Sequence, residues 1–295
     1  MISILIPVYN RDVTSLVTDL HVQATASGIA FELLVADDAS ENERSAAANA
    51  RLEGLPGVRY FFFPQNRGAG ATRQALAAQA RYSNLLLIDS DARIVGNSYF
   101  ARFTAYADGK TAVFGGIAYA PESRRENLRW WYGVNRECVP ADDKGNRPNG
   151  FLTTFNLLLP KDVFLREAGQ LSGYGHEDTL LGMQLERDGV RVAHINNPLL
   201  HMGLPDNETF LLQTDSAVRN LLTLYRSFEP LSLLRKRSRL IRLLERLRSL
   251  GLLRVYAAWF ALSERRLRKR LLSERPSLRD MDLYKLGKLV AYYLQ

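Results

Sequence analysis

The first ninety residues alternate between short segments that are apolar throughout and longer segments with helical periodicity. The apolar segments are expected strands, at residues 2–8, 31–36, 58–63 and 85–88. The spacing of apolar side chains predicts helices between them, over residues 14–26, 41–52 and 71–80. Strands that are apolar at every position are typical of a parallel sheet covered by helices on both faces. This alternation predicts an α/β fold with a Rossmann-like, mainly parallel sheet.

The pattern loosens beyond residue 115, and the composition changes near the C-terminus. A helix is expected over residues 178–188, ended by Gly189, followed by a strand at 190–195 and a helix at 208–227. After Pro230 the chain is rich in Leu and Arg. We therefore expect an α/β domain over residues 1–229 and a basic helical region over residues 230–295.

Composition excludes several classes of protein. The chain has 295 residues, of which 46% are hydrophobic and 24% charged, so it has enough apolar residues for a core without a disulfide or metal. Its single cysteine, Cys138, excludes a scaffold built on intramolecular disulfides. No segment has the roughly 20 consecutive apolar residues of a membrane-spanning helix, and the N-terminus does not resemble a signal peptide. These features favour a cytoplasmic location.

The net charge of +8 is distributed unevenly. Residues 231–295 hold 17 Lys and Arg against 5 Asp and Glu, whereas residues 1–230 hold 22 against 26. A nucleic-acid-binding interpretation can therefore apply only to the C-terminal region, which has no recognisable nucleic-acid-binding motif. We expect no nucleic-acid partner.

Residues 231–272 are expected to form two amphipathic helices. Their apolar positions are Leu240, Leu243, Leu244, Leu247 and Leu250, then Val255, Ala258, Trp259 and Leu262. Leu and Trp on one face with Arg on the other is typical of helices that lie on an anionic membrane surface. The alternative is that the leucines pack against the protein itself or a second subunit and the arginines are solvated.

Polar side chains follow the expected strands at the point where each strand ends. They are Asn10, Asp37, Asp38, Asp89 and Asp91. In an open parallel sheet these ends line the ligand-binding crevice, and several carboxylates there favour a divalent cation such as Mg²⁺ or Mn²⁺. The alternative is that these residues only end the strands. Because the chain has neither a GxGxxG nor a GxxxxGK[ST] motif, the sequence disfavours a dinucleotide-dependent dehydrogenase and a P-loop NTPase.

Five short motifs occur in one order along the chain. They are Pro7-Val8-Tyr9-Asn10-Arg11, Val35-Ala36-Asp37-Asp38-Ala39-Ser40, Asn66-Arg67-Gly68-Ala69-Gly70-Ala71-Thr72-Arg73, Asp89-Ser90-Asp91 and Gly173-Tyr174-Gly175-His176-Glu177-Asp178. Together they resemble the family 2 glycosyltransferases, which have the GT-A fold and use nucleotide-activated sugars. The resemblance spans residues 1–205. It implies a GT-A, mixed but mainly parallel sheet flanked by helices, with a C-terminal helical extension.

The resemblance also implies roles for individual residues. On the donor side it implies that the nucleobase and ribose pocket is formed by Pro7, Tyr9, Asp37 and Asp38. It also implies that Asn66 and Arg73 contact the nucleotide and that Asp89 contacts the ribose or the donor sugar. The metal ligands that it implies are Asp91 and His201. On the acceptor side it implies that Asp178 is the catalytic base and that Glu177 orients the acceptor. It leaves open which of Asp37 and Asp38 meets the base.

These residues predict a metal-dependent inverting glycosyltransferase. A cation on the diphosphate stabilises the leaving group, and one carboxylate suffices to take the proton of the attacking hydroxyl. We expect Mn²⁺ or Mg²⁺, a UDP-sugar donor, a glycan or lipid-linked acceptor, and a peripheral location on the inner face of the cell membrane. The alternatives are a nucleotidyltransferase, although residues 7–12 lack its glycine-rich basic loop, and a non-catalytic sugar-nucleotide-binding scaffold protein at a membrane complex.

Overall fold

A computed structural model describes residues 1–121, 126–141, 152–167 and 174–295, and it divides into two compact units. Unit 1 comprises residues 1–120, 138–170 and 184–203, and unit 2 comprises residues 121–137, 171–183 and 204–295. Gly173, which opens the last of the five motifs, lies outside the described residues. The boundary between residues 229 and 230 that composition suggests stays a prediction.

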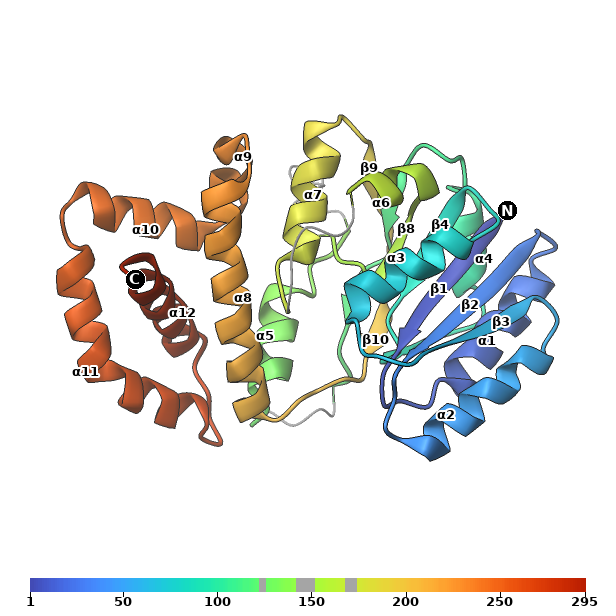
Figure 1. Ribbon diagram of the computed structural model, residues 1–295, viewed down its shortest axis with the longest axis horizontal. Helices are drawn as coiled ribbons and strands as arrows, with labels where there is room; N and C mark the ends of the chain where they lie inside the picture. Colours follow the sequence, from blue (N-terminus) through green and yellow to red (C-terminus); the bar gives the residue numbers. More distant parts are fainter. Residues whose placement is uncertain (122–125, 142–151, 168–173) are drawn as a thin grey trace. The chain divides into compact units, whose positions relative to one another are not determined.

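Unit 1 contains a seven-stranded sheet in the order β3-β2-β1-β4-β8-β6-β9 (Figure 1). Its strands are β1 (Ile2–Val8), β2 (Phe31–Asp38), β3 (Val58–Phe63), β4 (Asn84–Ile88), β6 (Ala112–Phe114), β8 (Asn156–Pro160) and β9 (Val192–His194). Strand β8 is antiparallel to both β4 and β6, whereas the other neighbours are parallel. The mainly parallel sheet that the sequence predicts is therefore confirmed.

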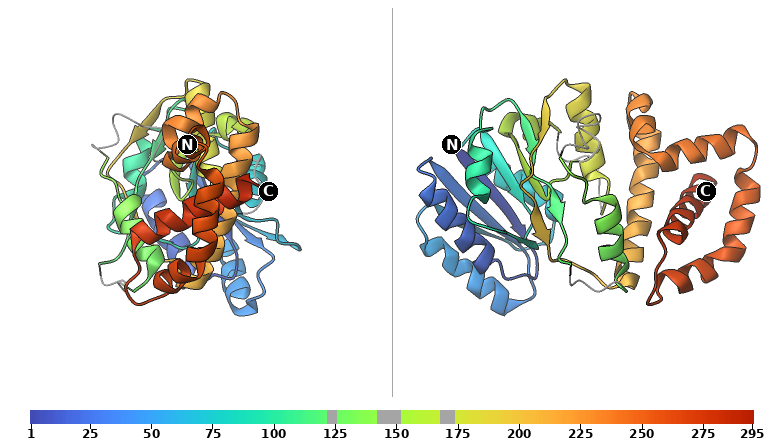
Figure 2. Two further views of the ribbon diagram at one scale, coloured as in Figure 1. Left: turned by 90° about the vertical axis from the view of Figure 1, so that its left-hand side faces the viewer. Right: turned by 180° about the vertical axis from the view of Figure 1, so that it is seen from behind.

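Helices cover both faces of this sheet. They are α1 (Thr14–Ala26), α2 (Glu43–Ala50), the short 3-10 helix η1 (Arg51–Gly54), α3 (Ala69–Gln79), α4 (Tyr99–Thr104) and α6 (Lys161–Glu167). Helices α3 and α6 pack on one face, and α1 and α4 on the other (Figures 1 and 2). Strands β1 and β4 are buried along their whole length because both faces are covered, which explains their uninterrupted apolar sequence.

Several element boundaries differ by one or two residues from the sequence-based expectation, and two of these differences concern the strand and the loop that carry candidate donor-site residues. Strand β2 continues through Asp37 and Asp38, because their backbones pair with Phe62 and Phe63 of β3. Helix α3 begins at Ala69, because Gly68 has a positive φ of 83° and ends the preceding loop. Both aspartates are therefore held in the sheet rather than in a turn.

A second, three-stranded sheet in unit 1 joins β5 (Ala92–Arg93), β10 (Leu199–His201) and β7 (Ile117–Ala118). The fully buried Asn156 of β8 connects it to the large sheet. Its amide nitrogen donates to the carbonyl oxygens of Gly116 and Asn197, each at 2.9 Å, and its Oδ1 accepts from the Tyr99 hydroxyl at 2.7 Å. A Cβ at Gly115 would collide with the Asn156 side chain, so the glycine leaves room for the side chain that makes these three hydrogen bonds.

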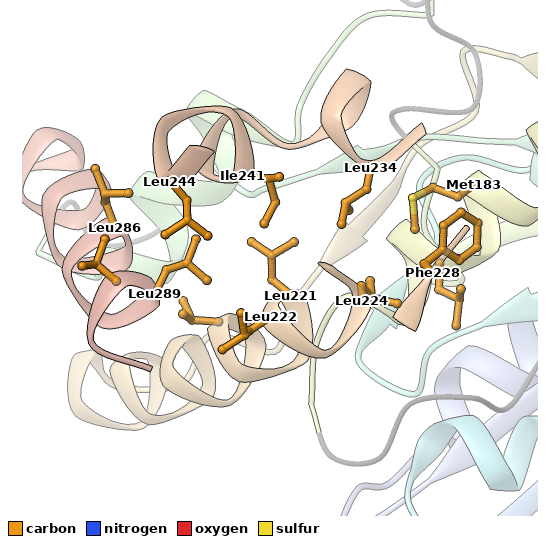
Figure 3. Packing of buried hydrophobic residues seen from close by; sticks show 13 residues of the cluster. Met183, Leu221, Leu222, Leu224, Phe228, Leu234, Ile241, Leu244, Leu286 and Leu289 are labelled. Atoms are coloured by element: carbon orange, nitrogen blue, oxygen red, sulfur yellow. The ribbon is translucent and has the colours of Figure 1, made fainter. Parts of the chain in front are cut away.

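Unit 2 is helical. Its helices are α5 (Leu128–Arg136), the first seven residues of α7 (Glu177–Arg187), α8 (Asn207–Ser227), α9 (Leu231–Arg237), α10 (Arg239–Ser249), α11 (Leu253–Leu271) and α12 (Leu278–Tyr293). Helix α12 packs against α8, α10 and α11 (Figure 1). A cluster of buried apolar side chains from α7, α8, α9, α10 and α12 forms its core; Leu221, Ile241, Leu244 and Leu289 are fully buried in it (Figure 3).

The expectation of two helices within residues 231–272 is wrong, because the chain forms three there. Ser238 has an extended backbone, and its hydroxyl accepts a hydrogen bond from the Ile241 N–H, so it ends α9 and caps α10. Helix α12 follows them. It is buried on several sides, so its sequence has no apolar stripe of helical period to indicate it.

None of the helices in the described part of the chain combines the length and the hydropathy needed to cross a bilayer.

Candidate active site

The carboxyl ends of β1 and β2 lie side by side in unit 1. Pro7 is buried in β1 and pairs with Ala36, and Val8 pairs with Asp37. Tyr9 directly follows the strand and is 46% exposed. The sheet therefore places Tyr9 at the end of β1 and the two aspartates at the end of the neighbouring strand β2.

Asp37 and Asp38 are buried, and both are held by hydrogen bonds. The Asp37 carboxylate accepts from the Ser40 N–H at 2.7 Å and from the Tyr60 hydroxyl at 3.1 Å. Burial and the charge of Asp37 raise the pKa of Tyr60, so this hydroxyl stays protonated and keeps donating. The Asp38 carboxylate accepts from the N–H groups of Arg67 and Gly68, at 2.8 to 3.2 Å. Asp38 thus fixes the loop that leads into α3.

Asn66, Arg73 and Asp89 lie around the same loop and the end of β4. Asn66 is exposed, and its side-chain oxygen accepts from the Gly68 N–H at 3.1 Å. The guanidinium of Arg73, on α3, is buried and forms an ion pair with the Asp89 carboxylate. The structure thus pairs two residues that the resemblance assigns separately to the donor.

Asp91 and His201 are brought together by the small sheet. His201 pairs with Ala92 across the antiparallel β5–β10 ladder, and the Met202 N–H donates to the Asp91 carbonyl at 2.8 Å. His201 Nε2 lies 3.7 Å from Asp91 Oδ2. A Cβ at Gly203 would collide with the Asp91 carboxylate, so the glycine is what allows the carboxylate to approach this strand.

The imidazole of His201 stacks on two aromatic rings. The ring centroids of Tyr119 and Phe155 lie 5.4 and 5.0 Å from that of His201, and both are nearly parallel to it, at 20° and 22°. Stacking on two rings fixes the plane of the imidazole, whose Nε2 lies near the Asp91 carboxylate. Sequence reasoning missed Tyr119, Phe155 and Gly203, because each lies far along the chain from Asp91.

Asp91 and His201 together offer one carboxylate oxygen and one imidazole nitrogen as candidate metal ligands. Within the described residues, no group of three or more His, Cys, Asp and Glu side chains is arranged to hold a metal ion. A cation at this pair would need further ligands from a bound molecule or from water, which is how Mg²⁺ is held by one or two carboxylates and substrate phosphates.

Glu177 and Asp178 open helix α7 in unit 2. Both occupy its first turn, where carboxylates interact favourably with the unpaired N–H groups of the helix. Helix α8 fixes the segment before them. The Asn220 amide donates to the carbonyl oxygens of Tyr174 and Gly175, at 3.3 and 2.9 Å. Gly175 has a φ of 97°, and a Cβ there would collide with Ala217 of α8.

His176 caps the same turn and is uncharged at neutral pH. Its Nδ1 lies 3.0 Å from the Thr179 hydroxyl, and its carbonyl accepts from the Leu180 N–H at 2.9 Å. Burial lowers the pKa of His176 to about 4, and the positive charge of Lys285 on α12 acts in the same direction. The ammonium of Lys285 donates to the Tyr132 hydroxyl at 3.0 Å. The C-terminal helix therefore contributes a cation near this motif, which the sequence did not indicate.

The aromatic residues of α5 are mainly structural. Trp130 is buried and stacks on Trp131, with centroids 5.9 Å apart, and Tyr132 packs against the cluster around Phe210. Trp130 is therefore part of the protein's core.

Comparison with known families identifies the chain. The sequence model of "Glycosyl transferase family 2" matches residues 3–164, which is more than half of the chain. The protein belongs to glycosyl transferase family 2. As a member, it is a glycosyltransferase that transfers sugar from a nucleotide-sugar. A comparison with curated proteins gives no match.

Solved structures confirm that the family member has the GT-A fold. The mannosyltransferase PcManGT from Pyrobaculum calidifontis, in complex with GDP-Man and Mn²⁺, aligns over 100% of this chain and 88% of its own, with a TM-score of 0.60 at 13% identity. S. aureus TarS 1–349, in complex with UDP-GlcNAc, aligns over 99% and 91%, with a TM-score of 0.52 at 15% identity. Glucosyl-3-phosphoglycerate synthase from Mycobacterium tuberculosis aligns over 75% and 79%, with a TM-score of 0.51 at 19% identity.

Proposed function

We propose that this family 2 member is a metal-dependent, inverting hexosyltransferase. Its donor would be a UDP-sugar, and its acceptor a hydroxyl of a glycan or lipid-linked saccharide in the synthesis of a cell-surface polysaccharide or glycoconjugate. The observation that carries the proposal is the pair of Asp91 and His201, whose ligand atoms lie 3.7 Å apart at the end of the sheet.

The residues present fit a divalent cation. Asp91 and His201 would hold Mn²⁺ or Mg²⁺ through one oxygen and one nitrogen, and the donor's diphosphate would supply further oxygens. PcManGT, which shares the fold, was solved with Mn²⁺ and GDP-Man. When bound, the ion would neutralise negative charge that develops on the departing diphosphate. The room left by Gly203 and the two rings that stack on His201 keep both ligand atoms in place.

The strand ends of unit 1 would form the donor pocket. Tyr9 offers an exposed ring for stacking on a base, and the Asp37 and Asp38 carboxylates lie at the end of the neighbouring strand. Asn66, Arg73 and Asp89 would contact the ribose, the phosphates or the donor sugar. Among the fold relatives, TarS was solved with UDP-GlcNAc and PcManGT with GDP-Man, so GDP is the alternative nucleotide.

The first turn of α7 would serve the acceptor. As a bond forms between the acceptor oxygen and the anomeric carbon, the bond from that carbon to the diphosphate oxygen breaks. The Asp178 carboxylate would take the proton of the attacking hydroxyl, and Glu177 would accept a hydrogen bond from the acceptor and orient it. A single displacement of this kind inverts the anomeric configuration. The uncharged His176 contacts Thr179 and would help to hold this turn.

The activity can be tested on the full chain without knowledge of the acceptor. Nucleotide release from a panel of UDP-, GDP- and dTDP-sugars, with water as the acceptor, should require Mn²⁺ or Mg²⁺ and stop when EDTA is added. The Asp91→Ala variant should lose metal-dependent nucleotide binding in calorimetry. Asp19→Ala, which removes an exposed carboxylate from α1, is the matched control and should bind normally. Equal nucleotide affinity in Asp91→Ala would refute the metal-binding role.

A further inference from the structure

The two long amphipathic helices of the basic region have different surroundings. On α10, Leu244 and Ile241 are fully buried, and Leu240, Leu243 and Leu247 pack against the same apolar cluster (Figure 3). The apolar face of α10 is thus covered by the protein itself. It is not available to a partner.

Helix α11 and the turn before it leave apolar side chains in solvent. Val255 is 64% exposed and Leu262 is 88% exposed, with Trp259 between them on the same face of the helix at a spacing of four and three residues. Leu250 and Leu252, in the turn between α10 and α11, extend this surface. We call these five residues the α11 apolar face.

Exposed cations without ion pairs accompany this face. They are Arg246, Arg254, Arg265, Arg266 and Lys269, and none forms an ion pair within the described part of the chain. By contrast, Arg268 and Arg270 on the same helix pair with Glu208 and Asp280. Arg268 and Arg270 are thus neutralised, whereas the other five cations are not.

We propose that the α11 apolar face and its five cations bind the anionic surface of a lipid bilayer, with α11 lying along the bilayer plane. An exposed Trp, Leu and Val face flanked by Arg and Lys has the composition of helices that insert their apolar side at the headgroup level and hold anionic lipids electrostatically. This inference rests on the proposed function in one respect: the bilayer would be the surface on which the enzyme encounters a lipid-linked acceptor.

A bilayer fits this surface better than a second copy of the chain. A two-fold symmetric contact places the same patch on both partners, so five unpaired cations from each copy would meet five from the other. Such like-charge repulsion opposes association. Anionic lipid headgroups supply the opposite charge, and the acyl region accepts the apolar side chains.

Vesicle sedimentation of the full chain tests the proposal. The protein should sediment with phosphatidylcholine vesicles that contain phosphatidylglycerol, more weakly with phosphatidylcholine alone, and less as salt is added. Two double variants separate the contributions: Trp259→Ser with Leu262→Ser for the apolar part, and Arg265→Gln with Arg266→Gln for the charge. Each should lower partitioning into anionic vesicles by about tenfold or more.

The controls separate this proposal from the catalytic one. Val95→Ser with Val22→Ser removes two apolar side chains of unit 1 that are 63% and 61% exposed, and this variant should bind vesicles normally. All variants should keep the wild-type melting temperature and rate of donor hydrolysis. Unchanged vesicle binding in both α11 variants would overturn the proposal, and so would a dimer in solution that these variants dissociate. Absence of donor hydrolysis with intact vesicle binding would instead refute the enzyme assignment alone.

Discussion

The two units hold their candidate site carboxylates by different means. In unit 1, Asp37 and Asp38 extend from a buried strand and accept hydrogen bonds from loops at the sheet edge. In unit 2, Glu177 and Asp178 open a helix whose preceding segment is fixed by α8 through Asn220. The first arrangement depends on strand register and the second on helix packing. Under the proposed roles, damage to unit 1 should affect donor binding, and damage to unit 2 should affect the chemical step.

The largest effect expected from this comparison is that of Asp178→Asn. Loss of the base should lower the rate of sugar transfer by about 10³-fold, while donor affinity stays that of the wild type. Asp91→Ala should give the opposite pattern, with nucleotide affinity lost. Calorimetry with the nucleotide and single-turnover transfer measure the two quantities. If Asp178→Asn transfers sugar at the wild-type rate, Asp178 is not the base.

A second comparison concerns two leucines of the basic region. Leu244→Ala on α10 should lower the free energy of unfolding by about 2–5 kcal/mol, because the side chain is fully buried in the helical core. Leu262→Ala on α11 should change it by no more than about 0.5 kcal/mol, because the side chain is 88% exposed. Urea denaturation of both variants measures the difference. Equal losses would mean that the outer face of α11 is also covered.

The last effect expected is a pH dependence of stability from His176. An unfolded histidine binds a proton near pH 6.5, whereas folded His176 does so only near pH 4. The unfolded state therefore binds more protons between these values, and the free energy of unfolding falls as the pH is lowered from 6.5 to 4. The loss is on the order of 3 kcal/mol.

Denaturation at several pH values, compared with His176→Gln, isolates this contribution. Lys285→Met should make the dependence shallower, because removal of the positive charge raises the pKa of His176. Lys285→Arg keeps the charge and serves as the control. If the free energy of unfolding of His176→Gln and of the wild type changed in parallel between pH 4 and 6.5, the lowered pKa of His176 would be contradicted.

The parts of the molecule differ in how far the sequence alone predicts them. The apolar segments predict β1 and β3 with their observed bounds and place Asp37, Asp38 and Asp89 at strand ends, because local pattern determines a buried parallel strand. The predicted number of helices within residues 231–272 was wrong. A single serine cap separates α9 from α10, and α12 has no amphipathic stripe.

The contacts that refine the site were not predictable from local pattern. Gly203 makes room for Asp91, and Phe155 and Tyr119 stack on His201, across separations that range from 46 to 112 residues of chain. Lys285 lies still farther along the chain from Tyr132. Such contacts depend on how distant segments pack. A single sequence with no aligned relatives gives no signal for them.

The hydrogen bonds of Asn156 have a consequence for the two proposed metal ligands. Through Gly116 and Asn197 they attach the small sheet, which carries His201, to the large sheet whose strand β4 ends just before Asp91. The two proposed ligands therefore belong to one rigid framework, and their separation is set by the fold rather than by an ion. If Asp91 and His201 hold a cation, binding it would therefore require no reorganisation of these two side chains.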